Sequence, residues 1–269
     1  MFKSYCWLVL LLLLGASSYA QKSTEQAVLL KTITASPAAA IEYVSYDKQG
    51  MYIAAATVTG DILLCNATDG TIVQQLKGHT KLINHLSFSK SGNLIASASD
   101  DGTIKVWSVK TGALIQSLET AASHALFREA YFVLFSPDEK YLYFGGRTKK
   151  LCQVPISGNA DFTVLYKSDY DLTSAVYSPE KRFLVFASGY EIYFYDLKTN
   201  EIAQSIEADK NFVNDLSFNH KGNNLAVWLE NGNVKFWDYP SLKFNRTLKA
   251  GNKDYSHVAF SYDDKYLAT

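Results

Sequence analysis

The chain of 269 residues has no excess of either charge, because its 26 Lys and Arg residues balance its 26 Asp and Glu residues. A nucleic-acid-binding protein or a polybasic membrane protein would carry a clear positive excess, so the sequence argues against both classes. Proline is scarce, with five residues, and only 19% of residues are charged, which is atypical of a proline-rich linker or a coiled coil. Hydrophobic residues make up 48% and aromatic residues 14%. The remaining class is a globular, β-rich protein with a sizeable core.

No hydrophobic run is long enough to cross a bilayer. The most apolar segment, residues 7–14, is far shorter than the ~20 residues that a spanning helix needs. It follows one basic residue, Lys3, and precedes a tail of small residues in which Ser18 and Ala20 fit a cleavage site. We therefore predict that residues 1–20 are a signal peptide, that the mature protein is exported, and that no transmembrane segment remains after cleavage.

Cysteine and metal-binding patterns are also scarce. Beyond the predicted signal peptide only Cys65 and Cys152 remain, and the repeat described below places them on units that are not neighbours. A disulfide needs a Cα separation below about 7 Å, so we expect two buried free thiols. The histidines form no HExxH motif or other i, i+4 pair, and no zinc-type cluster or glycine-rich phosphate loop occurs. The sequence predicts no metal, no cofactor and no catalytic constellation.

One pattern recurs along the chain, an aromatic residue followed by a polar turn and an apolar strand. The six aromatic anchors are spaced by 42, 47, 42, 41 and 42 residues: Tyr46, Phe88, Phe135, Tyr177, Phe218 and Phe260. An alternating strand follows later in each full unit, at residues 62–66, 104–108, 150–154, 192–196 and 234–238. A further apolar strand comes next, as at residues 71–76, 113–118 and 201–206. Four short strands joined by polar turns form a β-meander.

A four-stranded sheet of this kind exposes two apolar faces and must stack against copies of itself. Arranged radially, such sheets form a β-propeller. The predicted fold class is therefore all-β, a propeller of four-stranded antiparallel blades. The expected blades span about residues 41–80, 82–120, 131–169, 172–210 and 213–251, with a truncated sixth at 255–269.

Residues 78–112 make the resemblance to a known family specific. They contain Gly78-His79, an Asp101-Gly102 turn and Trp107, and they resemble a WD40 repeat almost position by position. Trp237-Asp238 supplies the full Trp-Asp dipeptide in the fifth unit. The resemblance covers about residues 27–269 and identifies residues 21–269 as a WD40-like propeller.

The resemblance implies a buried hydrogen-bonded network in the second blade. In the family, a His, an Asp, a Ser and a Trp satisfy one another's polar atoms. Here these are His79, Asp101 and Trp107, with either Ser97 or Ser99, because the two serines share one face of a strand. The same His, Ser and Asp suggest a catalytic triad as the alternative, but the family uses this set structurally.

The ring is expected to be incomplete. Residues 27–34 resemble an orphan fourth strand that closes the last blade of a WD40-like ring. The chain stops at Thr269, inside the second strand of the sixth unit. Since such rings usually have seven blades, we expect the sequence to be part of a longer product.

The candidate partner-binding residues lie near the loops that join the fourth strand of one blade, strand d, to the first strand of the next, strand a. The loop at residues 121–130 is the longest of these and carries Phe127 and Arg128. Exposed aromatic residues beside arginine are typical of interfaces, although Phe127 could instead only cover a blade end, as could Phe212. Other candidates in these loops or in strand a are Tyr170, Asp171, Phe212, Asn84 and Asn214.

The resemblance and the missing catalytic motifs favour a non-catalytic, exported scaffold, of the bacterial cell-envelope type. It would bind a protein or peptide partner through its d–a loops. Two alternatives come from other classes. The chain could be the regulatory propeller of a larger enzyme, such as a protease, with its catalytic domain beyond Thr269. It could also be a propeller enzyme of the quinoprotein or lactonase kind, which would need ligands converging on the centre of the ring.

Overall fold

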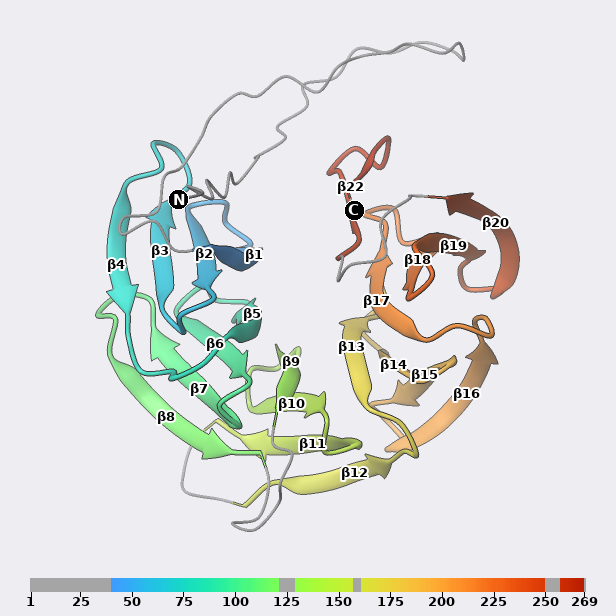
Figure 1. Cartoon of the computed structure of the whole chain (residues 1–269), viewed down its shortest axis with the longest axis horizontal. Coiled ribbons are helices and arrows are strands. Elements are labelled where there is room, and N and C mark those ends of the chain that lie inside the picture. Colours follow the sequence, from blue (N-terminus) through green and yellow to red (C-terminus); the bar gives the residue numbers. More distant parts are fainter. Residues whose placement is uncertain (1–39, 121–128, 157–160, 250–256, 269) are drawn as a thin grey trace, which may run out of the picture.

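The computed structural model of the chain describes residues 40–120, 129–156, 161–249 and 257–268. Five four-stranded antiparallel sheets, each in chain order, stand around a ring, followed by a two-stranded sixth sheet (Figure 1). The predicted all-β propeller with five full blades and a truncated sixth is therefore confirmed. The predicted signal peptide, residues 1–20, and the predicted closing strand, residues 27–34, lie outside the described residues.

The strands of each sheet follow one another along the chain, and their order defines strands a to d. The first sheet contains β1 (Ile41–Tyr46), β2 (Tyr52–Thr57), β3 (Ile62–Asn66) and β4 (Ile72–Leu76). The second contains β5 (Ile83–Phe88), β6 (Leu94–Ser99), β7 (Thr103–Ser108) and β8 (Leu114–Glu119). The third contains β9 (Ala130–Phe135), β10 (Tyr141–Gly146), β11 (Lys150–Pro155) and β12 (Thr163–Lys167). The fourth contains β13 (Leu172–Tyr177), β14 (Phe183–Ser188), β15 (Glu191–Asp196) and β16 (Glu201–Glu207). The fifth contains β17 (Val213–Phe218), β18 (Asn224–Leu229), β19 (Asn233–Asp238) and β20 (Lys243–Lys249), and the sixth β21 (Ala259–Phe260) and β22 (Leu267–Ala268).

The turn between strands a and b is closed in the same way in all six sheets. The residue directly after each aromatic anchor accepts a hydrogen bond from the backbone N–H five residues later, with distances of 2.8 to 3.1 Å. The accepting side chains are Asp47, Ser89, Ser136, Ser178, Asn219 and Ser261. Short polar side chains favour such turns because they bond to nearby backbone. The aromatic-then-polar pattern of the sequence is the signature of this turn.

Strand a carries a β-bulge near its start in each of the five full sheets. One residue is skipped in the pairing of strands a and b, four positions before the aromatic anchor. The skipped residues are Glu42, Asn84, Tyr131, Thr173 and Asn214. A bulge leaves its extra residue unpaired and redirects its side chain.

The core lies between the sheets. Five clusters of buried apolar side chains each join two neighbouring sheets, from the first pair to the fifth and sixth. Cys65 and Cys152 are buried and free, as the sequence predicts. They belong to separate clusters, since Cys65 packs within the first sheet and Cys152 packs between the second and third.

The second sheet contains a connected set of buried polar side chains. His79 contacts Asp101 through Nδ1 at 2.8 Å and Ser97 through Nε2 at 2.7 Å. The Trp107 indole N–H donates to the same Ser97 oxygen at 2.9 Å. Thr103 donates its hydroxyl to Asp101 at 2.6 Å. The structure thus brings together His79, Ser97, Asp101 and Trp107.

Ser99 lies outside this set. Its hydroxyl donates to the Leu82 carbonyl at 2.8 Å and accepts the Asp101 backbone N–H at 3.1 Å, so it fixes the turn that follows β6. Ser97 itself is 0% exposed. A nucleophile must reach its substrate, so this buried serine has the surroundings of a structural hydrogen-bonding group.

The Trp-Asp dipeptide of the fifth sheet has other contacts than the polar set around Trp107. Trp237 is buried between the fourth and fifth sheets and meets the Phe244 ring edge-on at 5.8 Å. Asp238 accepts a hydrogen bond from the Asn245 side chain at 2.6 Å. The dipeptide here anchors the outer strand of its own sheet.

We expect Trp107→Ala to lower the free energy of unfolding by about 3–5 kcal/mol, because it removes a fully buried indole and leaves a cavity. Leu114→Ala is the matched control, since Leu114 pairs with Trp107 across β7 and β8 but is 46% exposed. It should cost less than about 1 kcal/mol. Urea denaturation measures both losses, and a loss below about 1 kcal/mol for Trp107→Ala would contradict the packing described.

Asp101 makes stability depend on acid pH. Burial alone would raise the pKa of Asp101, but hydrogen bonds from His79, Thr103 and the Thr80 backbone outweigh it and hold this pKa well below its usual range. A depressed carboxyl pKa contributes stability above the unfolded value of about 3.9, and the contribution is lost as pH falls through the folded pKa.

We therefore expect Asp101→Asn to be less stable than the wild type at pH 7, by about 1.5–3 kcal/mol for lost charge-assisted hydrogen bonds. The difference should shrink as the pH falls below about 4. Thermal denaturation of both proteins from pH 7 to pH 2 checks this. A difference that stays constant over that range would show that the charge of Asp101 does not stabilise the fold.

Candidate functional site

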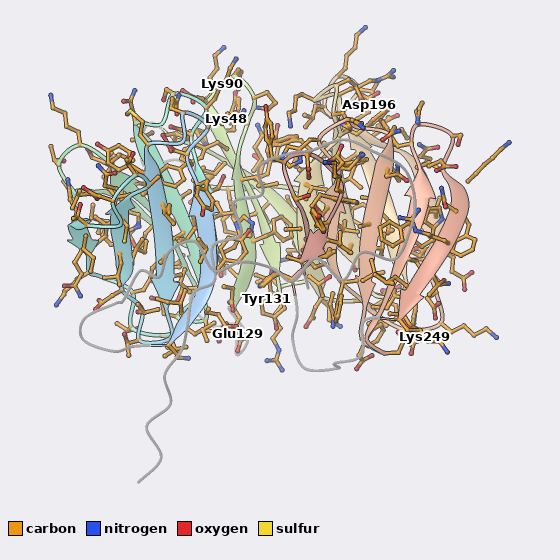
Figure 2. All side chains as sticks on the ribbon, turned by 90° about the horizontal axis from the view of Figure 1, so that it is seen from above. Lys48, Lys90, Glu129, Tyr131, Asp196 and Lys249 are labelled. Atoms are coloured by element: carbon orange, nitrogen blue, oxygen red, sulfur yellow. The ribbon has the colours of Figure 1, made fainter. Side chains whose placement is uncertain are left out.

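The d–a loops and the turns between strands b and c lie on one face of the propeller, called the d–a face below. Backbone hydrogen bonds join loop to turn there, from Arg147 to Glu129 at 3.0 Å and from Val213 to Gly189 at 2.9 Å. Figure 2 shows Glu129 at this face and Lys48 and Lys90 at the opposite one. The d–a loops and b–c turns therefore lie on the face opposite to that of Lys48 and Lys90.

A cavity of about 700 Å³ opens at the centre of the d–a face. All five bulge residues line this central cavity: Glu42, Asn84, Tyr131, Thr173 and Asn214. Each sheet thus contributes one side chain from an equivalent position. The bulge takes these residues out of the regular pairing with strand b and directs their side chains to the cavity. Two of these side chains also bond within the chain, since Asn84 donates to Asp100 and Thr173 donates to the Val213 carbonyl.

The predicted partner-binding residues gather at this cavity where the structure describes them. Asn84, Tyr170, Asp171, Phe212 and Asn214 all line it. Asn84 is held in place, since its amide donates to Asp100 at 2.7 Å and to the Ala130 carbonyl at 2.9 Å. The two other candidates, Phe127 and Arg128, lie outside the described residues.

Sequence reasoning missed three of the bulge residues, Glu42, Tyr131 and Thr173. They share no chemistry with Asn84 and Asn214, which drew attention by being the same residue type at the same register. The usable signal was position alone, four residues before each aromatic anchor.

The central cavity is lined by more acidic than basic side chains. Four carboxylates, on Glu42, Asp100, Glu129 and Asp171, face two basic side chains, on Arg147 and Lys149. Burial raises the pKa of the neighbouring Tyr131 to about 12, and the charges of Asp171, Glu129 and Asp100 add to this rise. Burial also raises the pKa of Asp171, against the opposing charges of Arg147 and Lys149. Both shifts are caused mainly by partial desolvation of these side chains.

Polar contacts join the fifth sheet to its neighbours beside this cavity. Asp215 accepts a hydrogen bond from Ser174 at Oδ1, at 2.7 Å, and one from the Val258 backbone at Oδ2, at 2.9 Å. The same Oδ2 lies 3.3 Å from His257 Nδ1. Burial opposes ionisation of Asp215, but these bonds keep its pKa below the usual range. The His257 ring in turn meets Tyr43 of β1 edge-on at 5.0 Å. This ring contact links the first sheet to the residue that lies two positions before β21.

Three aromatic rings form a cluster on the d–a face, called the aromatic triad below. Tyr170 lies 5.6 Å from both Tyr190 and Phe212, and the latter two rings are 4.6 Å apart. Tyr170 is 44% exposed. Sequence reasoning found Tyr170 and Phe212 but not Tyr190, which comes from a b–c turn. Exposed, mutually supported aromatic rings are the residue type that dominates binding interfaces.

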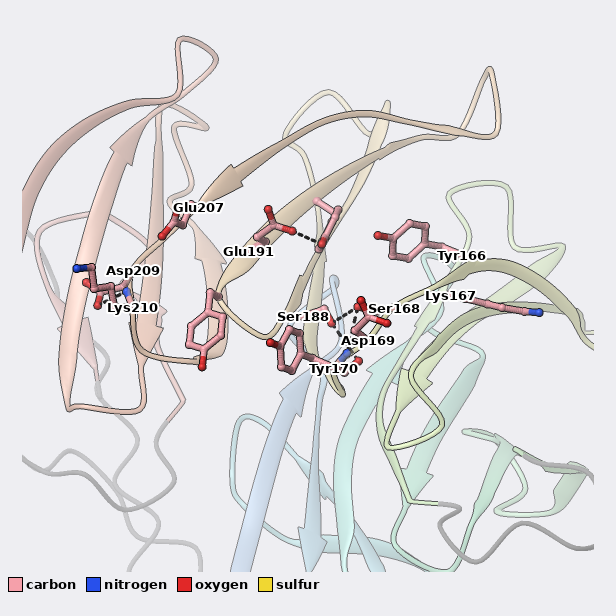
Figure 3. Close-up of a pocket in the computed structure, with 12 residues that line it drawn as sticks. Tyr166, Lys167, Ser168, Asp169, Tyr170, Ser188, Glu191, Glu207, Asp209 and Lys210 are labelled. Atoms are coloured by element: carbon pink, nitrogen blue, oxygen red, sulfur yellow. Dashed lines mark hydrogen bonds between the residues drawn. The ribbon is translucent and has the colours of Figure 1, made fainter.

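A second cavity of about 540 Å³, the inter-blade groove, lies between the third and fourth sheets. Figure 3 shows Tyr166 and Tyr170 on the side of the third sheet and Glu207 and Asp209 on the side of the fourth. Asp209 forms an ion pair with Lys235 at 2.5 Å. Tyr170 lines both this groove and the central cavity, so the two hollows adjoin.

Neither a metal cluster nor a membrane-spanning helix occurs in the part of the chain that the structure describes. Among these residues, no three His, Cys, Asp or Glu side chains are grouped in a way that could hold a metal ion. The same residues include no helix with the length and apolarity needed to cross a bilayer.

Comparisons with known proteins agree with this architecture. Residues 70–108, which contain β4 to β7, match the family described as WD domain, G-beta repeat. No curated protein matches the sequence. Among the solved structures, the β-propeller domain of Cps50 (Swd1) from Myceliophteria thermophila is 18% identical with a TM-score of 0.74, over 84% of this chain and 77% of that one. A chain of a structure titled Mitotic Checkpoint Complex is 16% identical with a TM-score of 0.75, over 88% and 76%. At such identities the likeness establishes the β-propeller fold.

The position of the Tyr170 ring can be tested through Gly189. A Cβ atom at Gly189 would lie 2.5 Å from the Tyr170 ring, whereas one at Gly50 would meet nothing within 4 Å. Both glycines have positive φ, 62° and 70°. Gly50→Ala and Gly189→Ala should therefore share a backbone cost of about 1–2 kcal/mol, and Gly189→Ala should lose roughly 1–3 kcal/mol more through overpacking.

This additional loss should disappear when Gly189→Ala is made in a Tyr170→Ala background, because the clashing ring is then absent. Urea denaturation of the four variants and the wild type gives the comparison. Equal losses for Gly189→Ala and Gly50→Ala would mean that Tyr170 does not pack over residue 189.

Proposed function

We propose that the protein is an exported, non-catalytic scaffold that binds a protein or peptide partner on its d–a face. The observation that carries this proposal is the convergence of five equivalent bulge side chains and the aromatic triad on one preformed cavity. Such a cavity offers the aromatic anchors and polar groups from which binding hot spots are built.

The comparisons support an interaction role. One structural neighbour comes from a structure titled as a complex, and the family match covers the best-preserved repeat. Because fold alone does not fix function, the composition and shape of the d–a face are the main support for binding. The export part of the proposal rests on the signal-peptide pattern of residues 1–20, and a bacterial cell envelope is the compartment we propose.

The test is site-specific photo-crosslinking in the producing cell. A photoreactive residue at Phe212, on the d–a face, should give a discrete adduct of higher mass, because a bound partner covers that residue. The same residue at Lys48, on the opposite face, should give none and serves as the control. Adducts are resolved by gel electrophoresis after cell fractionation and identified by mass spectrometry.

Two results would contradict the proposal. Adducts from Lys48 alone, or from neither position, would remove the d–a face as the binding surface. Recovery of the protein from the cytoplasm with residues 1–20 still attached would contradict the proposed export.

A further inference from the structure

We infer that the segment bound on the d–a face is basic, and that it runs from the central cavity over the aromatic triad into the inter-blade groove. This inference rests on the proposed function and names the chemistry of its partner. Three observations support it: the excess of carboxylates that line the two cavities, two carboxylates that form no ion pair with a basic side chain of the described residues, and the aromatic rings that lie between these two carboxylates.

The charge of the two cavities departs from that of the whole chain. Together they are lined by eight carboxylate side chains and four Lys or Arg side chains, an excess of four negative charges. The chain as a whole has a formal net charge of zero. The negative charge is therefore concentrated on this path, where it attracts a basic partner and repels an acidic one.

Several of these carboxylates already have partners within the chain. Glu129 lies 3.4 Å from Arg147, Asp209 pairs with Lys235, and Glu191 accepts the Tyr193 hydroxyl. These contacts fix the walls of the two cavities.

Asp171 and Glu207 differ from these paired carboxylates in their contacts. Within the described ranges, neither carboxylate forms an ion pair with a basic side chain. Asp171 is half-buried in the central cavity, and Glu207 is exposed at the groove end of β16. Burial in the central cavity disfavours the charged form of Asp171, and the charges of Arg147 and Lys149 offset this only in part. Asp171 is therefore placed to gain from a further Lys or Arg supplied by the partner.

The aromatic triad lies between these two carboxylates along the path. Tyr170 lines both cavities, and its exposed ring is supported by Tyr190 and Phe212. Aromatic faces attract ammonium and guanidinium groups, and more strongly when water is partly excluded. A basic segment therefore finds attractive surface along the whole path.

Fluorescence anisotropy with the full chain tests the inference. The probe is a fluorescein-labelled decapeptide of alternating arginine and glycine, and the comparison peptide has glutamate in place of each arginine. The basic peptide should bind at least tenfold more tightly than the acidic one. Asp171→Asn and Glu207→Gln should each weaken its binding by roughly three- to tenfold, the range expected for loss of one charge-assisted contact.

Glu201→Gln is the matched control variant. Glu201 and Glu207 are the two ends of β16, and both substitutions remove one exposed carboxylate, but Glu201 lies at the end near the opposite face. The control should bind the basic peptide as the wild type does. Equal binding of the two peptides, no binding of the basic peptide, or an equal loss in Glu201→Gln would each overturn the inference.

The crosslinks from Phe212 show whether the inference of a basic segment fails alone or whether the proposed scaffold function fails as well. Partner peptides that carry several Lys or Arg residues at the crosslinked position support the inference. Acidic or neutral partner peptides would overturn it while leaving the scaffold role intact. No adduct from Phe212 would reject the scaffold role itself.

Discussion

Every full sheet of this protein is apolar on both faces, and this constraint determines where the rest of the molecule lies. Strand b is buried along nearly its whole length in all five full sheets, which requires a neighbour on each side. Sheets stacked around a common axis satisfy this need, because each one covers the faces of its neighbours. The starts of the a strands then converge, and the cavity at the centre of the d–a face is a direct result of that convergence.

The sequence predicted the fold because its signals are local. The aromatic anchor and the polar residue after it mark a turn whose hydrogen bond spans five residues, so spacing alone reveals the repeat. The candidate site was predicted only in part. A bulge residue is freed from strand pairing, so its chemical type varies, and Tyr131 and Thr173 gave no compositional signal. The choice between Ser97 and Ser99 also required the three-dimensional structure, because two-residue periodicity places both on one face of the strand. The hydrogen bonds with His79 and Trp107 identify Ser97 as the member of the network.

The limited family match has a physical explanation. The polar network of His79, Ser97 and Asp101 belongs to the second sheet, and all three residues lie within the matched residues 70–108. Elsewhere other contacts anchor the strands, as in the fourth sheet, where the Arg182 guanidinium binds Asp196 through two hydrogen bonds of 2.9 and 2.7 Å. Apolar stacking and the turn hydrogen bond recur in every sheet. Family-specific polar residues can therefore diverge while the architecture persists.

The bulges of strand a have a consequence for how such a surface changes over time. Their five side chains lie outside the apolar clusters between the sheets. Two of them also join neighbouring sheets, since Asn84 donates to the Ala130 carbonyl and Thr173 donates to the Val213 carbonyl. Each full sheet thus supplies one cavity-lining side chain from the same backbone position, and the type of this side chain varies among the sheets. A selection library restricted to these five codons would change the lining of the cavity while leaving the apolar clusters between the sheets intact.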